Sequence, residues 1–99
     1  MAGSKQAIVS CIVSVLSNYP VKKAFLFGSY ARNDYTDESD VDILLEFTEP
    51  IGLRYGSLYT DLKEVLQKEP GLMTLKGLDE RSAQFAENVK SSLEVIYES

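Results

Sequence analysis

The sequence contains no histidine, no tryptophan and a single cysteine, Cys11, among its 99 residues. Without histidine the chain lacks the usual general base of enzymes and the commonest zinc ligand, and one cysteine cannot replace it. A lone cysteine also excludes an internal disulfide, which favours a reducing compartment. No apolar run approaches the roughly 20 residues that span a bilayer, and the first residues lack the pattern of a secretory signal. We therefore expect a cytoplasmic protein without membrane attachment.

Positive charge is also scarce, because 10 Lys and Arg residues stand against 15 Asp and Glu residues, for a formal net charge of −5. This balance argues against extended binding to nucleic acid, which requires basic surface. Acidic side chains can still hold a divalent metal that brings nucleotide phosphates with it. The hydrophobic fraction of 44% is typical of a folded protein, and the length predicts one domain over residues 1–99.

Hydrophobic periodicity predicts helices and short strands in alternation. The expected helices cover residues 4–18 with Ser4 as N-cap, 29–32, 54–68, and a last stretch from Asp79 or Ser82 towards Tyr97. The expected strands cover residues 22–27, 40–47 and 72–75, the last after a break at Pro70-Gly71. This α-β-α-β-α-β-α order predicts an α/β (α+β) fold in which helices pack on a small sheet of about three strands. We expect a mixed sheet, because the link from Phe27 to Asp40 is short for a parallel crossover.

The stretch GSYARNDYTDESDVD, residues 28–42, places a Gly-Ser pair ten residues before an Asp-x-Asp pattern. Side chains two apart in a strand share a face, so Asp40 and Asp42 should present parallel carboxylates. Two such anions repel each other, and Mg²⁺ removes the repulsion while sharing its other positions with water and phosphates. Gly28 and Ser29 can admit a phosphate to the backbone at a helix start. The stretch therefore predicts a metal–triphosphate clamp.

Each half of this pattern alone has an ordinary structural explanation. Gly-Ser is common in turns, and Asp-x-Asp is frequent at solvated strand edges. The order of the two halves and their strand–turn–strand context favour the clamp.

The pattern resembles the signature of the nucleotidyltransferase superfamily that includes DNA polymerase β, and the short chain resembles its minimal nucleotidyltransferase (MNT) branch. The similarity covers nearly the whole chain, including KKAFLFGS, Ala31-Arg32, SDVDILLEF and LMTLKGLDE. The resemblance implies the nucleotidyltransferase fold and metal-dependent transfer of a nucleoside monophosphate, usually AMP from ATP, to a hydroxyl acceptor. By the same resemblance, the catalytic, Mg²⁺-binding residues would be Asp40 and Asp42, and the nucleotide-binding residues would be Gly28, Ser29 and Arg32. For Arg32, simple coverage of the surface is an equally good interpretation.

The family pattern also uses a third carboxylate on the next strand, which commonly binds the catalytic metal and helps to activate the acceptor. Alignment of LMTL with that strand puts Gly71 at this position. Glu46 shares the strand face of Asp40 but lies too far along the strand to replace it. Glu69 is nearer in sequence, although an exposed glutamate at a helix end is the commoner arrangement.

Three functions are compatible with these residues. Minimal nucleotidyltransferases are commonly encoded beside a helical HEPN-domain partner, and the first hypothesis is an antitoxin that adds AMP to a tyrosine of such a toxin. The second is a catalytically impaired module that binds nucleotide or neutralises a helical partner by contact. The third is transfer to a small molecule such as an aminoglycoside, although those enzymes usually add a second domain. A homo-oligomer or a partner chain would supply the acceptor surface.

Overall fold

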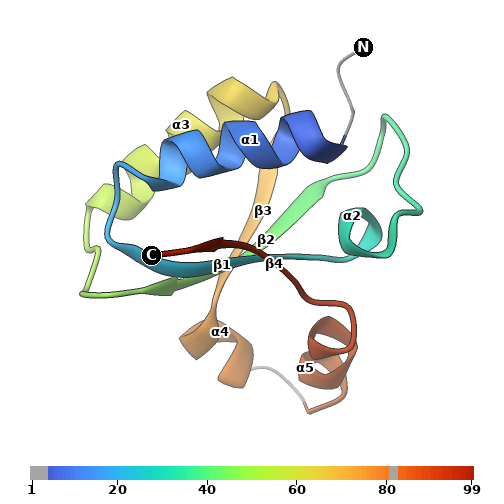
Figure 1. Cartoon of the computed structure of the whole chain (residues 1–99). Coiled ribbons are helices and arrows are strands. Elements are labelled where there is room, and N and C mark those ends of the chain that lie inside the picture. The colour runs from blue at the N-terminus through green and yellow to red at the C-terminus, as the bar shows by residue number, and fades with distance from the viewer. Residues whose placement is uncertain (1–4, 81–82) are drawn as a thin grey trace.

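The computed structural model describes residues 5–80 and 83–99, which form a four-stranded sheet with helices on both faces (Figure 1). In chain order the elements are α1 (Lys5–Leu16), β1 (Val21–Phe27), α2 (Ser29–Arg32), β2 (Val41–Phe47), α3 (Arg54–Leu66), β3 (Pro70–Thr74), α4 (Leu75–Asp79), α5 (Ala83–Lys90) and β4 (Glu94–Glu98). The strand order is β3-β2-β1-β4. Strand β1 is antiparallel to both of its neighbours, whereas β2 and β3 are parallel. The predicted mixed sheet is therefore confirmed.

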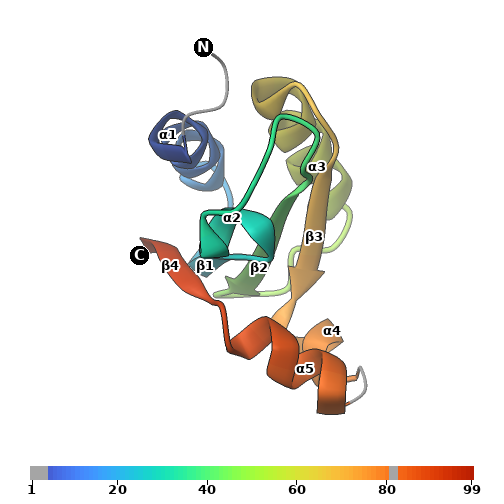
Figure 2. The same ribbon diagram turned by 90° about the vertical axis from the view of Figure 1, so that its right-hand side faces the viewer.

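Both faces of the sheet are covered. Helices α1 and α3 lie on one face, and the shorter α4 and α5 lie towards the other (Figures 1 and 2). The core consists of two hydrophobic clusters, and successive side chains of β2 point into different ones. Ile43 packs in the larger cluster, with α1 and α3, and Leu44 packs in the smaller cluster, with Leu78 and Val89. Burial of each such side chain contributes about 1.5–3 kcal/mol. The central strands are consequently apolar on both sides, as the sequence predicts.

The helices and strands predicted between residues 5 and 66 agree with the structure to within about two residues. Helix α2 is followed by its C-cap residue Asn33, whose φ of 65° is left-handed, and α3 is followed by Gln67 in the same conformation. The predicted N-cap, Ser4, lies outside the described residues. None of the helices in the described ranges has the length and apolar character that crossing a bilayer requires.

The start of the third strand differs from the prediction. Pro70 and Gly71 do not form a break but are the first two residues of β3, paired with Val41 and Asp42. Proline is compatible with this position because it opens a strand at the edge of the sheet. Leu75, expected in the strand, instead begins α4, where the Thr74 hydroxyl caps the helix by accepting a hydrogen bond from the Gly77 N–H at 2.9 Å.

The predicted last helix is wrong over its second half, and the predicted count of about three strands becomes four. Helix α5 ends at Lys90, and Glu94–Glu98 forms β4 against the open edge of β1. Val95, Ile96 and Tyr97 favour a strand. Val95 pairs with Phe25 of β1 and Tyr97 with Ala24, and the register shifts between these two pairs. Of the two predicted caps, Asp79 is the last residue of α4, and Ser82 lies outside the described residues.

Candidate functional site

Asp42 occupies the centre of one end of the sheet. In the strand register it lies between Phe27, the last residue of β1, and Gly71, the second residue of β3. Its side chain is half-buried, and the alternation along β2 places it on the face that carries Leu44. Asp40 precedes the strand and is exposed.

A glycine stands on each side of the Asp42 carboxylate. Gly28 follows β1 with a φ of 73°, and a β-carbon built there would lie 2.6 Å from Asp42 Oδ2. A β-carbon built at Gly71 would overlap Asp42 Oδ1. With Asp42 in this conformation, neither position has room for a side chain. We call this space between Gly28 and Gly71 the carboxylate slot.

The electrostatics of the slot favour a cation. Burial raises the pKa of the Asp42 carboxyl, the negative charge of Asp40 raises it further, and the positive charge of Arg32 partly opposes both effects. A cation shared by Asp40 and Asp42 would remove the repulsion between them. Among the described residues, no group of three or more His, Cys, Asp and Glu side chains is arranged to hold a metal. Two carboxylates plus phosphate and water oxygens nevertheless form a donor set that suits Mg²⁺.

The Gly-Ser pair lies beside the slot, as the motif predicts. Gly28 is the N-cap of α2, and its carbonyl accepts a hydrogen bond from the Arg32 N–H at 3.1 Å. Ser29 is the first residue of this single helical turn. Arg32 ends the turn, is exposed, and has its guanidinium paired with Asp34 at 3.2 Å. The fold therefore brings Gly28, Ser29 and Asp42 together and turns Arg32 towards Asp34.

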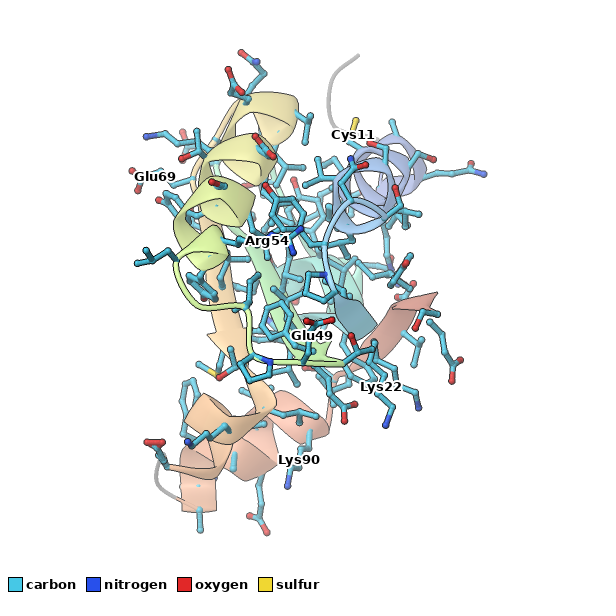
Figure 3. All side chains as sticks on the ribbon, turned by 90° about the vertical axis from the view of Figure 1, so that its left-hand side faces the viewer. Cys11, Lys22, Glu49, Arg54, Glu69 and Lys90 are labelled. Atoms are coloured by element: carbon cyan, nitrogen blue, oxygen red, sulfur yellow. The ribbon has the colours of Figure 1, made fainter. Side chains whose placement is uncertain are left out.

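Neither candidate for the third carboxylate is directed into the slot. Glu46 pairs with Lys22 at 3.7 Å, towards the opposite end of β2. Glu69 pairs with Lys63 at 3.5 Å and lies at the outer margin of the molecule (Figure 3). The register places Gly71 directly beside Asp42, so the position that the resemblance assigned to the third carboxylate adjoins the site and carries no side chain.

The sequence pattern does not single out Lys68. Tyr30 and Tyr35 do lie within the predicted motif, where aromatic packing is the expected role. The Lys68 ammonium, in the connection from α3 to β3, donates to the carbonyls of Asp37 at 3.1 Å and Ser39 at 2.8 Å. The rings of Tyr30 and Tyr35 stack with their centroids 4.2 Å apart. No local pattern indicates the contact of Lys68 with Ser39, because the two residues are 29 positions apart in the chain.

Comparison with known proteins extends these observations. The profile of a family described as the nucleotidyltransferase domain matches residues 10–95. A protein of Methanocaldococcus jannaschii, provisionally named a protein adenylyltransferase, is 43% identical over 68 residues, which span 68% of this chain and 73% of the relative. A second relative from that organism, with the same provisional name, is 44% identical over 57 residues and is matched over 58% of its own length.

Two solved structures share the fold. A crystal structure of a toxin–antitoxin with AMP-PNP matches with a TM-score of 0.71 and 19% identity, over 92% of this chain and 73% of the other. A complex of tri-AMPylated Shewanella oneidensis HEPN toxin with MNT antitoxin matches with a TM-score of 0.69 and 18% identity, over 97% and 74%. The predicted nucleotidyltransferase fold is thus confirmed. Because the family profile covers most of its length, this chain belongs to the nucleotidyltransferase domain family.

Proposed function

We propose that the chain is a Mg²⁺-dependent adenylyltransferase that transfers AMP from ATP to a hydroxyl acceptor. The observation that carries the proposal is the carboxylate slot, which holds Asp42 between two glycines and next to Asp40. Membership of the family supports nucleotidyl transfer. The fold shared with a toxin–antitoxin that contains AMP-PNP supports an adenine nucleotide as donor.

In this proposal Asp40 and Asp42 hold the metal, and Gly28 and Ser29 hold the triphosphate. Bound Mg²⁺ would offset negative charge on the triphosphate during the transfer. The absence of a side chain at Gly28 lets phosphate oxygens approach the backbone, where the Ser29 hydroxyl and the first N–H groups of α2 are donors. The acceptor hydroxyl gives its proton to solvent water as its oxygen bonds to the α-phosphorus. The bond from that phosphorus to the β,γ-phosphates breaks, and pyrophosphate leaves with the bonding electron pair. Fixed positioning and charge stabilisation carry most of the rate in such transfers.

We further propose a tyrosine of a HEPN-type toxin as the acceptor, so that the chain acts as an antitoxin. The support is the similar structure in which an MNT antitoxin is bound to a tri-AMPylated HEPN toxin. The provisional name of the Methanocaldococcus relative, a protein adenylyltransferase, points to the same class of acceptor.

The test is incubation of the purified chain with α-³²P-labelled ATP, Mg²⁺ and a HEPN protein encoded next to it. We expect label on the HEPN protein that depends on Mg²⁺. Asp42→Ala should abolish the label, whereas Asp37→Ala, a substitution in the exposed loop of the same chain, should retain it. Absence of label with the unmodified chain, or equal label with Asp42→Ala, would overturn adenylyl transfer.

A second candidate function, neutralisation of the partner by contact without catalysis, is favoured by Gly71. The register leaves no carboxylate opposite Asp42, and the described residues contain no three-carboxylate group. Under this hypothesis Gly71→Asp should produce labelling that the unmodified chain lacks. The new side chain requires only that the Asp42 carboxylate rotates away from Gly71. Gly71→Asn is the matched control, because it adds the same bulk without the charge, and robust labelling by the unmodified chain would end this alternative.

A further inference from the structure

The loop that carries the chain from α2 to β2, residues 33–39, is tied to the rest of the molecule at both ends. At the α2 end, the Lys5 ammonium donates to Asn33 Oδ1 at 2.9 Å, and the Lys5 backbone N–H donates to the Tyr35 hydroxyl at 3.2 Å. The same ammonium pairs with Glu94 at 2.6 Å, which connects the loop to β4. The first half of the loop is therefore held by α1.

The second half of the loop is held by Lys68. Its ammonium donates to the carbonyls of Asp37 and Ser39 and lies 5.8 Å from the centre of the Tyr30 ring, which is fully buried. Ser39 directly precedes Asp40, so the bond at 2.8 Å fixes the backbone immediately before the two aspartates. Within the segment itself, the Ser39 N–H donates to the Thr36 carbonyl at 3.0 Å, the Thr36 N–H donates to the Ser39 hydroxyl at 2.9 Å, and the Glu38 N–H donates to the Thr36 hydroxyl at 3.3 Å. These bonds shape a local turn, and those from Lys68 tie it to the rest of the molecule.

Lys68 also connects this segment to the neighbouring strand. It lies two residues before Pro70, which pairs with Val41, and three before Gly71, which pairs with Asp42. A single side chain thus joins the segment that leads into β3 to the segment that leads into β2. The part of the chain that Lys68 contacts carries Asp37 and Glu38, and Asp40 follows directly. Repulsion among these three carboxylates favours an open loop. A cation bonded to the backbone within that segment opposes this opening.

We propose that Lys68 is a positioning residue that holds residues 36–39 in place and thereby sets Asp40 and Asp42 for binding Mg²⁺ with ATP. The effect of Lys68 on binding of Mg²⁺ and ATP rests on the proposed function. The restraint that Lys68 places on residues 36–39 does not. Two substitutions separate its charge from its geometry. Lys68→Met keeps the aliphatic length and removes the donors, and Lys68→Arg keeps the charge and the capacity to bond two carbonyls.

The hold on the loop is measured by hydrogen–deuterium exchange on the metal-free chain. Backbone amides over residues 36–42 should exchange about tenfold faster in Lys68→Met, because charge-assisted hydrogen bonds that restrain them are lost. Lys68→Arg should restore the slow exchange. Lys63→Met, which removes an exposed lysine paired with Glu69 near the end of α3, is the matched control and should leave these amides unchanged.

The consequence for the site is measured by calorimetric titration with a non-hydrolysable ATP analogue at a series of Mg²⁺ concentrations. We expect Lys68→Met to need about tenfold more Mg²⁺ for half-maximal binding, and Lys68→Arg to stay within about twofold of the unmodified chain. Loss of the lysine charge alone would strengthen attraction of Mg²⁺ and weaken attraction of the triphosphate. A titration with Mg²⁺ and no nucleotide separates these effects, because a lysine that acted only through its charge would there give tighter Mg²⁺ binding in Lys68→Met.

Different results would contradict the role of Lys68 and the proposed adenylyltransferase function. Unchanged exchange over residues 36–42 in Lys68→Met would overturn the positioning role whatever the titration gives. Faster exchange with an unchanged or lower Mg²⁺ requirement would overturn its effect on the metal pair. Failure of the unmodified chain to bind the ATP analogue at any Mg²⁺ concentration would overturn the proposed function, while the exchange data would still decide whether Lys68 holds the loop.

Discussion

Glycine is required at position 28 for two reasons, the backbone conformation and the close approach of the Asp42 carboxylate. Its φ of 73° lies in the left-handed region, which costs a residue with a β-carbon about 1–2 kcal/mol. Its missing side chain also leaves room for the Asp42 carboxylate, whose Oδ2 would lie 2.6 Å from a β-carbon at position 28. Gly52 has a similar φ of 59° but no atom within 4 Å of the equivalent β-carbon. Gly28 combines its positive φ with a ψ of −148°, and it has a side-chain neighbour that Gly52 lacks.

We expect Gly28→Ala to lower the free energy of unfolding by about 1 kcal/mol or more beyond the loss caused by Gly52→Ala. Both variants place a β-carbon at a positive φ, and Gly28→Ala adds the contact with Asp42. Urea unfolding of the two variants gives the difference. When Asp42→Ala is introduced first, the excess should shrink, and an excess of unchanged size in that background would show that Asp42 is not its cause.

At the scale of elements, the least expected feature is β4. Its five residues occupy the free edge of β1, and their two sides have different surroundings. Ile96 packs against the larger core cluster, whereas Val95 is 52% exposed. Tyr97 packs against the same cluster as Ile96, because the register with β1 shifts between Ala24 and Phe25.

Ile96→Asn should therefore destabilise the chain by about 1–3 kcal/mol, because it removes buried apolar area and introduces an amide beside the core. Val95→Asn makes a nearly identical chemical change one residue away and should cost less than about 1 kcal/mol. Equilibrium unfolding in urea measures both free energies. Equal losses at the two positions would contradict the packing of β4.

The elements that the sequence predicts well are those whose signals are local. The pattern of residues 28–42 locates a strand end, a turn and a second strand, and it identifies Gly28, Ser29, Asp40 and Asp42 within a few positions. The C-terminal error arises because Phe85, Val89, Leu93 and Ile96 recur at helical spacing. What makes residues 94–98 a strand is the open edge of β1, about 70 positions earlier, which no periodicity encodes. The contact of Lys68 with Ser39 escapes local analysis for the same reason.

At the scale of the whole molecule, the metal-free site weakens the fold. An Asp42 carboxyl with a raised pKa binds its proton more readily in the folded chain than in the unfolded chain. Stability is therefore lost as pH rises from the ordinary pKa of an aspartate through the raised value, and the loss persists at neutral pH. The sign follows from burial and from Asp40, which both oppose ionisation.

Without metal, Asp42→Asn should accordingly melt at a higher temperature than the unmodified chain at pH 7 to 8. The advantage should shrink as the pH approaches 4, where the unmodified carboxyl takes up its proton. Circular dichroism melting curves across this range measure both melting temperatures. Asp37→Asn, in the exposed loop, is the control and should show no comparable trend. An advantage for Asp42→Asn that grew towards acid pH would contradict the assigned cause.

The stacked rings of Tyr30 and Tyr35 give the molecule an optical consequence. With no tryptophan in the chain, near-ultraviolet absorption comes from six tyrosines and four phenylalanines. The stacked pair, whose ring centres are 4.2 Å apart, lies in the segment that links the Gly-Ser turn to the two aspartates. Because fixed packing of tyrosine rings contributes to near-ultraviolet circular dichroism, a ligand that rearranges this segment should change that signal without any added label.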